Sequence, residues 1–264
     1  MLLREHSAFF WLLMFLFAIF SCPKHEDRIR ALEETCLPQI NPEGCDIRYI
    51  YGDSDEVRED GRNLYLPCNE SYKNLLQKTQ ETIKFAVKNN FDYLVKLDSD
   101  IYIPNFDNLV GAVESISKNK ITFATSVSDR IIGNDFIDPE NPPEGARKWH
   151  YGKVEEQDRV PYTGIFPKKW AQGHCYVLDK TNCRILADEL CEDKYELASS
   201  DPSKNWLYED MAISHILFSK GVDLVEMGRL VEHLTIDHRG LKTEEIRDRH
   251  KYFTERYSKC QSKT

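Results

Sequence analysis

Two acidic residues directly follow a predicted buried strand in the middle of the chain. The strand covers residues 91–97, and Asp98 and Asp100 come after it with Ser99 between them. Because alternate residues of an extended chain point to the same side, we expect the two carboxylates to share one face. They stand at the carboxyl end of a strand, where open α/β sheets bind ligands. Without a cation two carboxylates repel each other, so the pair indicates a divalent metal ion that can bridge to a diphosphate.

A second acidic pair, Glu209 and Asp210, begins a helix that we predict over residues 208–220. Acidic residues suit the first turn of any helix, because the helix dipole is positive there. A carboxylate in this place could also act as a general base that takes a proton from an attacking hydroxyl. The residue types leave both interpretations open.

Two histidines near the end of the chain could add a nitrogen ligand to the metal. They are His233 and His238, which follow a strand predicted over residues 222–225. A lone histidine is usually a surface residue or a hydrogen-bonded core residue, but either of these could complete a site of mixed oxygen and nitrogen ligands. The sequence does not choose between them.

The composition excludes several classes of protein. The chain has 264 residues, of which 41% are hydrophobic and 30% charged, and its net charge is −9. The hydrophobic share, together with only 12 glycines and 11 prolines, excludes a collagen-like, low-complexity or disordered chain. An acidic chain also binds nucleic acid poorly, since lysine and arginine must neutralise the phosphates, so any phosphate here should belong to a small ligand. The eight cysteines include no C-x-x-C pair, which disfavours a structural zinc site and leaves the disulfide state open.

Helices and strands alternate along most of the chain. The clearest helix is predicted over residues 71–89, where apolar residues recur at spacings of three and four. Other helices are expected over 24–35 and 243–259, further strands over 46–51, 121–125 and 174–178, and a long surface excursion over 132–167. The alternation predicts one α/β domain with a largely parallel sheet.

The apolar run 8–20 has two interpretations. Its 13 residues are fewer than the roughly 18–20 that span a bilayer, so it suits either a signal-peptide core or a strand buried on both faces. The strand is favoured because aromatic and β-branched residues dominate the run. Membrane association through residues 8–20, as an anchor, stays open.

Several segments, in the same order, resemble glycosyltransferase family 31, the β-1,3-galactosyltransferase and fringe-like enzymes. They are SCPKHEDRIRALEETC (21–36), NESYKNLLQKTQETIKF (69–85), DYLVKLDSDIYIPNFDNL (92–109), RKWHYGKV (147–154), KWAQGHCYVL (169–178) and LYEDMAISHIL (207–217). The third resembles the family's metal motif and the last its E-D-V helix. The chain departs from the pattern at Cys36, Glu70, Gln172, His174 and Cys175, and the last three put the acceptor in doubt more than the donor.

The resemblance implies a GT-A fold, a Rossmann-like nucleotide-diphospho-sugar transferase fold with a mostly parallel central sheet and flanking helices. It implies one domain over 13–264, with a nucleotide-binding part at about 13–110, an acceptor-binding part at about 111–264 and an extension at 1–12. It also implies a UDP-sugar donor, a manganese ion (Mn²⁺) as cofactor, a glycan or glycoconjugate acceptor and a role in protein glycosylation. The Golgi membrane or lumen is the implied location, and the cytoplasm stays open because no separate anchor and stem are visible.

The resemblance also assigns roles to individual residues. Asp100 and His233 are implied as metal ligands, and the implied contacts of the donor nucleotide or sugar are Arg28, Asp98, Ser99 and Asp100. Asp210 is implied as the catalytic base, with Glu209 as second candidate. The implied lining of the donor and acceptor cleft consists of Trp149, Trp170 and Gly173. For the two tryptophans, core packing is an equal alternative. For Lys78 and Lys96 the ordinary explanation is a charge on a solvated face or at a strand edge, without a role in the site. We favour this ordinary explanation for Lys78.

The implied reaction is a single displacement that inverts the sugar carbon. Asp210 would take the proton of the acceptor hydroxyl, and an aspartate with an ordinary pKa is ionised at neutral pH. A hexose or N-acetylhexosamine would be moved, with a β-1,3 linkage expected; the sugar and the acceptor stay open. The alternative is a domain of the same fold that binds UDP-sugar or glycan without transferring it.

Overall fold

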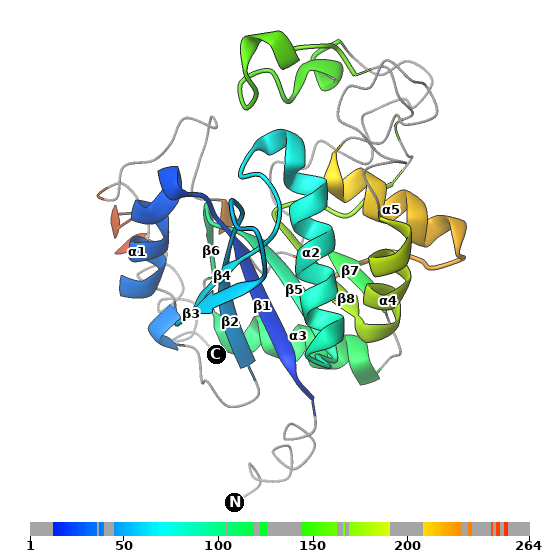
Figure 1. Ribbon diagram of the computed structural model, residues 1–264. Helices are drawn as coiled ribbons and strands as arrows, with labels where there is room; N and C mark the ends of the chain where they lie inside the picture. Colours follow the sequence, from blue (N-terminus) through cyan, green and yellow to red (C-terminus); the bar gives the residue numbers. More distant parts are fainter. Residues whose placement is uncertain are drawn as a thin grey trace, which may run out of the picture.

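The structure is a computed structural model, and it describes residues 13–35, 37–39, 45–103, 105–118, 122–125, 144–162, 166, 169–190, 208–228, 232–233, 244, 247–248 and 251–252. These residues form a central sheet with helices on both faces (Figure 1). Of the helix expected over 243–259, the described residues 244, 247–248 and 251–252 are helical, and the rest lies outside the described residues. The part of the expected excursion before residue 144 also lies outside them.

An eight-stranded sheet is the middle layer, in the order β3-β4-β2-β1-β5-β8-β7-β9. Its strands are β1 Phe15–Phe20, β2 Cys45–Tyr51, β3 Arg58–Asp60, β4 Asn63–Tyr65, β5 Tyr93–Asp98, β7 Phe123–Thr125, β8 Cys175–Asp179 and β9 Val225–Glu226. The pairs β1–β2, β1–β5, β2–β4 and β7–β9 are parallel, whereas β3 is antiparallel to β4 and β8 is antiparallel to both of its neighbours. The α/β class with a mostly parallel sheet is therefore confirmed.

The apolar run near the N-terminus supplies the central strand of the sheet. Phe15–Phe20 is buried along its whole length and pairs in parallel with β2 and β5, with Phe17 opposite Ile47 and Val95. Backbone groups on both edges of this strand are hydrogen-bonded within the sheet, so the strand prediction is confirmed for Phe15–Phe20 and membrane association is not supported there. Residues 8–12 lie outside the described part.

Among the described residues, no helix has the length and apolar character needed to cross a membrane.

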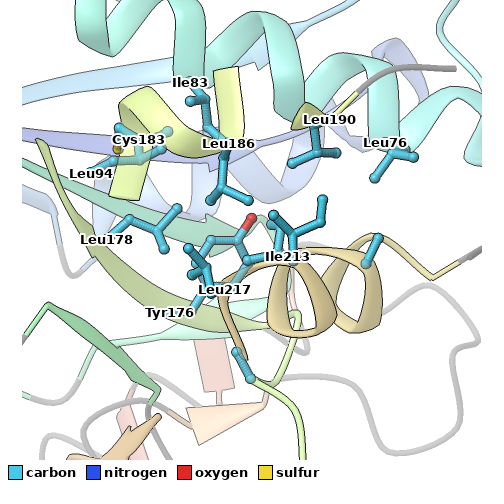
Figure 2. Packing of buried hydrophobic residues seen from close by; sticks show 14 of the residues in the cluster. Leu76, Ile83, Leu94, Tyr176, Leu178, Cys183, Leu186, Leu190, Ile213 and Leu217 are labelled. Carbon is cyan, nitrogen blue, oxygen red and sulfur yellow. The ribbon is translucent and has the colours of Figure 1, made fainter. Parts of the chain in front are cut away.

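Two helical layers cover the sheet. On one face, α1 Glu26–Glu34 and α3 Phe106–Lys118 pack over apolar residues of β1, β2 and β5. On the other, α2 Leu75–Lys88, α4 Lys180–Glu189 and α5 Glu209–Ser219 share a second core (Figure 1). In Figure 2, Ile83 from α2, Leu186 from α4 and Leu217 from α5 converge over Tyr176 of β8. Both cores consist mainly of leucine, isoleucine, valine and aromatic side chains, whose removal from water stabilises the fold.

A short antiparallel ladder lies beside the main sheet. Ile101–Tyr102 (β6) pairs with Glu232–His233 (β10), so that His233 is opposite Ile101 and Glu232 is opposite Tyr102. The ladder brings a segment near the end of the described chain to the residue that directly follows Asp100.

Candidate active site

The carboxyl end of β5 and the loop that precedes β8 lie together. Because β8 runs against β5, the residues entering β8 reach the edge of the sheet where β5 ends. The backbone N–H of Asp98 donates to the carbonyl oxygen of His174 at 3.1 Å, and that of Ser99 donates to Phe20 at 3.1 Å. The acidic motif is thus fixed between the central strand and the loop before β8.

Lys96 is the buried centre of this site. Its side chain is 1% exposed, and its ammonium donates to Asp98 Oδ1 at 2.6 Å and to the carbonyl oxygen of Gly173. Nζ also lies 3.9 Å from Oε1 of Glu209. Burial alone would lower the pKa of Lys96, but Asp98 and Glu209 hold it above its ordinary value. The strand-edge explanation of this lysine is therefore wrong: it is a buried cation among carboxylates.

Glu209 faces the interior at the start of α5. The residue is 4% exposed, and the hydroxyl of Tyr176 donates to its Oε1 at 2.7 Å. Burial raises the pKa of Glu209 to about 7, with Lys96 opposing the rise and the charge of Asp210 adding to it. This carboxyl is held inside the protein by Tyr176 and Lys96, which fits a supporting residue better than a base that must meet a substrate.

Asp210 is half-buried and is held by backbone amides. The N–H of Gly173 donates to Oδ2 at 3.1 Å, and the N–H of Met211 donates to Oδ1 at 2.9 Å. Burial raises the pKa of Asp210 above its ordinary value, although Lys96 and the two amides oppose the rise. The expectation of an ordinary aspartate pKa is therefore wrong. A raised pKa makes the ionised carboxylate a stronger base.

Gly173 lies against this acidic pair. A Cβ added there would lie 3.1 Å from Oδ2 of Asp210 and 3.5 Å from Oε2 of Glu209. A side chain would therefore displace the carboxylate that the Gly173 amide holds. The structure brings together four of the residues assigned by resemblance: Asp98, Gly173, Glu209 and Asp210.

Asp100 has a different partner from Asp98. The chain leaves β5 in a turn at Ser99 and Asp100, and Oδ2 of Asp100 lies 3.5 Å from Nη1 of Arg28 on α1. Alternation of sides within a strand ends with Asp98, the last residue of β5, so the two carboxylates contact different cations. Arg28 therefore lies beside the acidic motif.

The residues around Asp100 have donors suited to a divalent ion. Carboxylate oxygens suit Mn²⁺ and Mg²⁺, and an imidazole can add a nitrogen ligand. The backbone of His233 pairs with Ile101, so the β6–β10 ladder places the backbone of His233 opposite the residue that directly follows Asp100. Within the described residues, no three His, Cys, Asp or Glu side chains form a metal site by themselves. His238 lies outside the described residues.

The two tryptophans differ in their surroundings. Trp149 is 42% exposed, and its ring centroid lies 5.8 Å from that of Tyr208, the residue before Glu209. Trp170 is buried in the core next to the loop that holds Gly173. Trp149 therefore offers an aromatic surface near the start of α5, whereas the position of Trp170 favours the packing alternative.

A second buried lysine overturns the solvated-face expectation for Lys78. Its ammonium donates to the carbonyl oxygen of Ser21 at 2.5 Å and to Oε1 of Glu70 at 2.8 Å. Glu70 Oε2 in turn accepts from the N–H of Gly52 at 2.5 Å. Burial lowers the pKa of Lys78, and Glu70 opposes the shift. This ion pair joins α2 to the chain after β1 and β2.

No protein-family model matches this sequence, and no curated protein matches it. The resemblance to family 31 therefore remains a prediction.

Solved structures of glycosyltransferases are similar over most of the chain. A glycosyltransferase involved in the glycosylation of the major capsid of PBCV-1 is 11% identical over 90% of this chain and 99% of its own, with a TM-score of 0.47. Glucosyl-3-phosphoglycerate synthase from Mycobacterium tuberculosis was solved with Mn²⁺, UDP and phosphoglyceric acid. It is 11% identical over 91% of this chain and 75% of its own, with a TM-score of 0.44.

A third structure, described as a nucleotide-diphospho-sugar transferase from Desulfovibrio desulfuricans G20, is 8% identical over 93% of this chain and 99% of its own, with a TM-score of 0.43.

Proposed function

We propose that this chain is an inverting glycosyltransferase that moves a hexose or N-acetylhexosamine from a UDP-sugar to a hydroxyl of a glycan acceptor. One observation carries the proposal. Asp98, at the end of a parallel strand, and Asp210, at the start of α5, are joined through Lys96 and Gly173. This arrangement supports the assignment of a donor-binding acid and a catalytic base to the carboxyl edge of the sheet, where such folds bind ligands.

Asp210 is the proposed catalytic base. It would take the proton of the acceptor hydroxyl as that oxygen attacks the sugar carbon from the side opposite the UDP. Its raised pKa keeps it basic enough to accept the proton. Glu209 is buried against Tyr176 and would support Asp210 instead of reaching the acceptor.

The donor side of the proposed site consists of Arg28, Asp98, Ser99 and Asp100. Arg28 brings a guanidinium to the acidic motif, where it could contact the diphosphate. Asp100 and His233 would hold a divalent ion such as Mn²⁺, which when bound offsets the negative charge on the departing nucleotide. Membership of family 31 and a β-1,3 linkage rest on the sequence resemblance and are part of the proposal.

A screen of UDP-sugars tests the proposal. The full chain is incubated with Mn²⁺ and UDP-galactose, UDP-N-acetylglucosamine or UDP-N-acetylgalactosamine, with and without a panel of glycans, and released UDP is measured. We expect release with at least one donor, stimulation by an acceptor, and loss of both in Asp210→Asn. UDP binding without release from any donor would support the alternative, a domain that binds UDP-sugar or glycan without transfer.

A further inference from the structure

We infer that Lys96 is a positioning residue that holds the donor-side acid and the catalytic base in one arrangement, acting on the base through the backbone of Gly173. The inference deepens the proposed function and rests on it. One ammonium contacts Asp98 directly and Asp210 through one intervening residue. The sequence resemblance gives Lys96 no role, and the proposed function uses it only as the contact that joins Asp98 to Asp210.

Gly173 is the link, because both of its backbone polar groups are used. Its carbonyl oxygen accepts from Nζ of Lys96, and its N–H donates to Oδ2 of Asp210 at 3.1 Å. These two groups belong to different peptide units, which meet at the Gly173 Cα, and the hydrogen bond from the N–H of Cys175 to the carbonyl oxygen of Gln172, at 3.1 Å, closes a turn around both units. A turn held on one side by a buried ammonium presents the Gly173 amide in a fixed place on the other side. The position of the Asp210 carboxylate therefore depends on Lys96, although these two side chains need not touch.

Burial separates this role from direct catalysis. The ammonium lies 5.0 Å from the ring centroid of Phe20 and 5.7 Å from that of Tyr176, and the Lys96 side chain is 1% exposed. Aromatic faces attract a cation at such distances, so they help to hold the ammonium in place. An acceptor sugar has no access to Nζ here, and Lys96 acts by fixing the groups that the substrates meet.

The charge of Lys96 also compensates the nearby carboxylates, so it contributes to stability. Asp98 and Glu209 bring carboxylates to the same buried ammonium, at 2.6 and 3.9 Å. Removing one partner of a buried ion pair leaves uncompensated charge, which destabilises a protein strongly. Any test must therefore separate lost stability from lost positioning.

The test compares Lys96→Met with Lys78→Met, a matched variant that removes the other buried lysine and its pair with Glu70. Thermal midpoint, kcat and the KM for the UDP-sugar are measured, together with hydrogen exchange of the Gly173 amide. We expect both variants to lose thermal stability, but only Lys96→Met to lose kcat, by about 100-fold, because small misplacements of reacting groups cost that much. Its donor KM should change less than kcat, and its Gly173 amide should lose protection from exchange.

Two further variants keep the test decisive if Lys96→Met does not fold. Lys96→Arg keeps the positive charge but replaces the compact ammonium with a planar guanidinium. This variant should fold, keep an intermediate kcat and show partial protection of the Gly173 amide from hydrogen exchange. Gly173→Ala crowds Asp210 without touching the buried charge, and should lower kcat as Lys96→Met does. Gly152→Ala is its control, because a Cβ there would meet no atom within 4 Å.

Three results would overturn the inference. The first is a wild-type kcat in Lys96→Met or in Gly173→Ala, and the second is an equal loss of kcat in Lys96→Met and Lys78→Met. The third is unchanged protection of the Gly173 amide from hydrogen exchange in folded Lys96 variants. If the wild-type chain releases no UDP from any donor, the proposed function fails. The exchange of the Gly173 amide then still decides whether Lys96 fixes this peptide, so the two failures are distinguishable.

Discussion

The guanidinium of Arg28 lies 3.5 Å from the carboxylate of Asp100, measured from Nη1 to Oδ2. Both side chains are largely shielded from water, at 11% and 18% exposure. The acid proposed to hold the metal therefore has a cation of the protein beside it. A divalent ion bound at Asp100 would therefore share that carboxylate with Arg28.

We expect Asp100→Asn to lose Mn²⁺-stimulated UDP release by about 100-fold or more, because a catalytic metal supplies several kcal/mol of charge stabilisation. The free energy of unfolding should fall by roughly 1–2 kcal/mol, since Arg28 loses a partly shielded partner. Titration with Mn²⁺ and urea unfolding measure the two effects. Asp46→Asn is the control, because it breaks the Asp46–Arg48 pair at the start of β2. An undiminished response to Mn²⁺ in Asp100→Asn would remove Asp100 from the metal site.

The two acids at the start of α5 should respond differently to amide substitution. Asp210→Asn should lower kcat by about 100- to 10,000-fold, the usual contribution of a general base, while UDP still binds. Glu209→Gln should keep the hydrogen bond from Tyr176 and lower kcat by less than about tenfold. Steady-state kinetics and calorimetry of UDP binding give both values. If Glu209→Gln is the more damaging change, Glu209 is the base and Asp210 supports it.

Glu209 should make stability depend on pH in a defined window. Its pKa in the folded protein, about 7, lies above its ordinary value of 4.5. The folded state then holds the proton that the unfolded state releases, so this contribution to stability is complete below pH 4.5 and is lost as pH rises to 7. The thermal midpoint of Glu209→Gln minus that of wild type should therefore increase as pH rises from 4.5 to 8. A constant difference across that range would contradict the raised pKa.

The Glu70–Lys78 pair should matter for stability. Glu70→Gln leaves a buried ammonium with a weaker partner, and we expect the free energy of unfolding to fall by about 3 kcal/mol or more. The control is Asp158→Asn, which breaks the more exposed pair of Asp158 with Lys73 and should cost about 1 kcal/mol or less. Urea unfolding compares the two variants. Equal losses would mean that the buried pair contributes no more than a surface pair.

The parts of the fold that apolar periodicity encodes were predictable. The stripe of α2 appears at nearly the expected residues, and β1 covers the last 6 residues of the expected run, because burial on one or both faces leaves a direct pattern. The same signal was present but overlooked in α3, where Phe106, Leu109 and Val113 recur at helical spacing and are buried. In α4 the overlooked signal is Asp179, whose side chain caps the helix by accepting from the N–H of Asn182.

The direction of β8 and the contacts of Lys96 were not predictable in this way. Nothing in residues 174–178 distinguishes a parallel from an antiparallel strand, because the side chains alternate in both. A lysine in an apolar strand, two residues before an acid, hints at a buried ion pair, but Glu209 comes from a distant part of the chain. The Lys96–Gly173–Asp210 connection exists only once the sheet is complete.

The reversed course of β8 has a consequence for how the chain acquires its structure during synthesis. A ribosome that has released the polypeptide only as far as β7 has exposed a lysine within an apolar strand, while Gly173 and Glu209 are still untranslated. Long-range pairings of this kind form slowly, and transiently exposed apolar segments favour aggregation. The order of translation thus makes insertion of β8 and docking of α5 the late events that bury this charge.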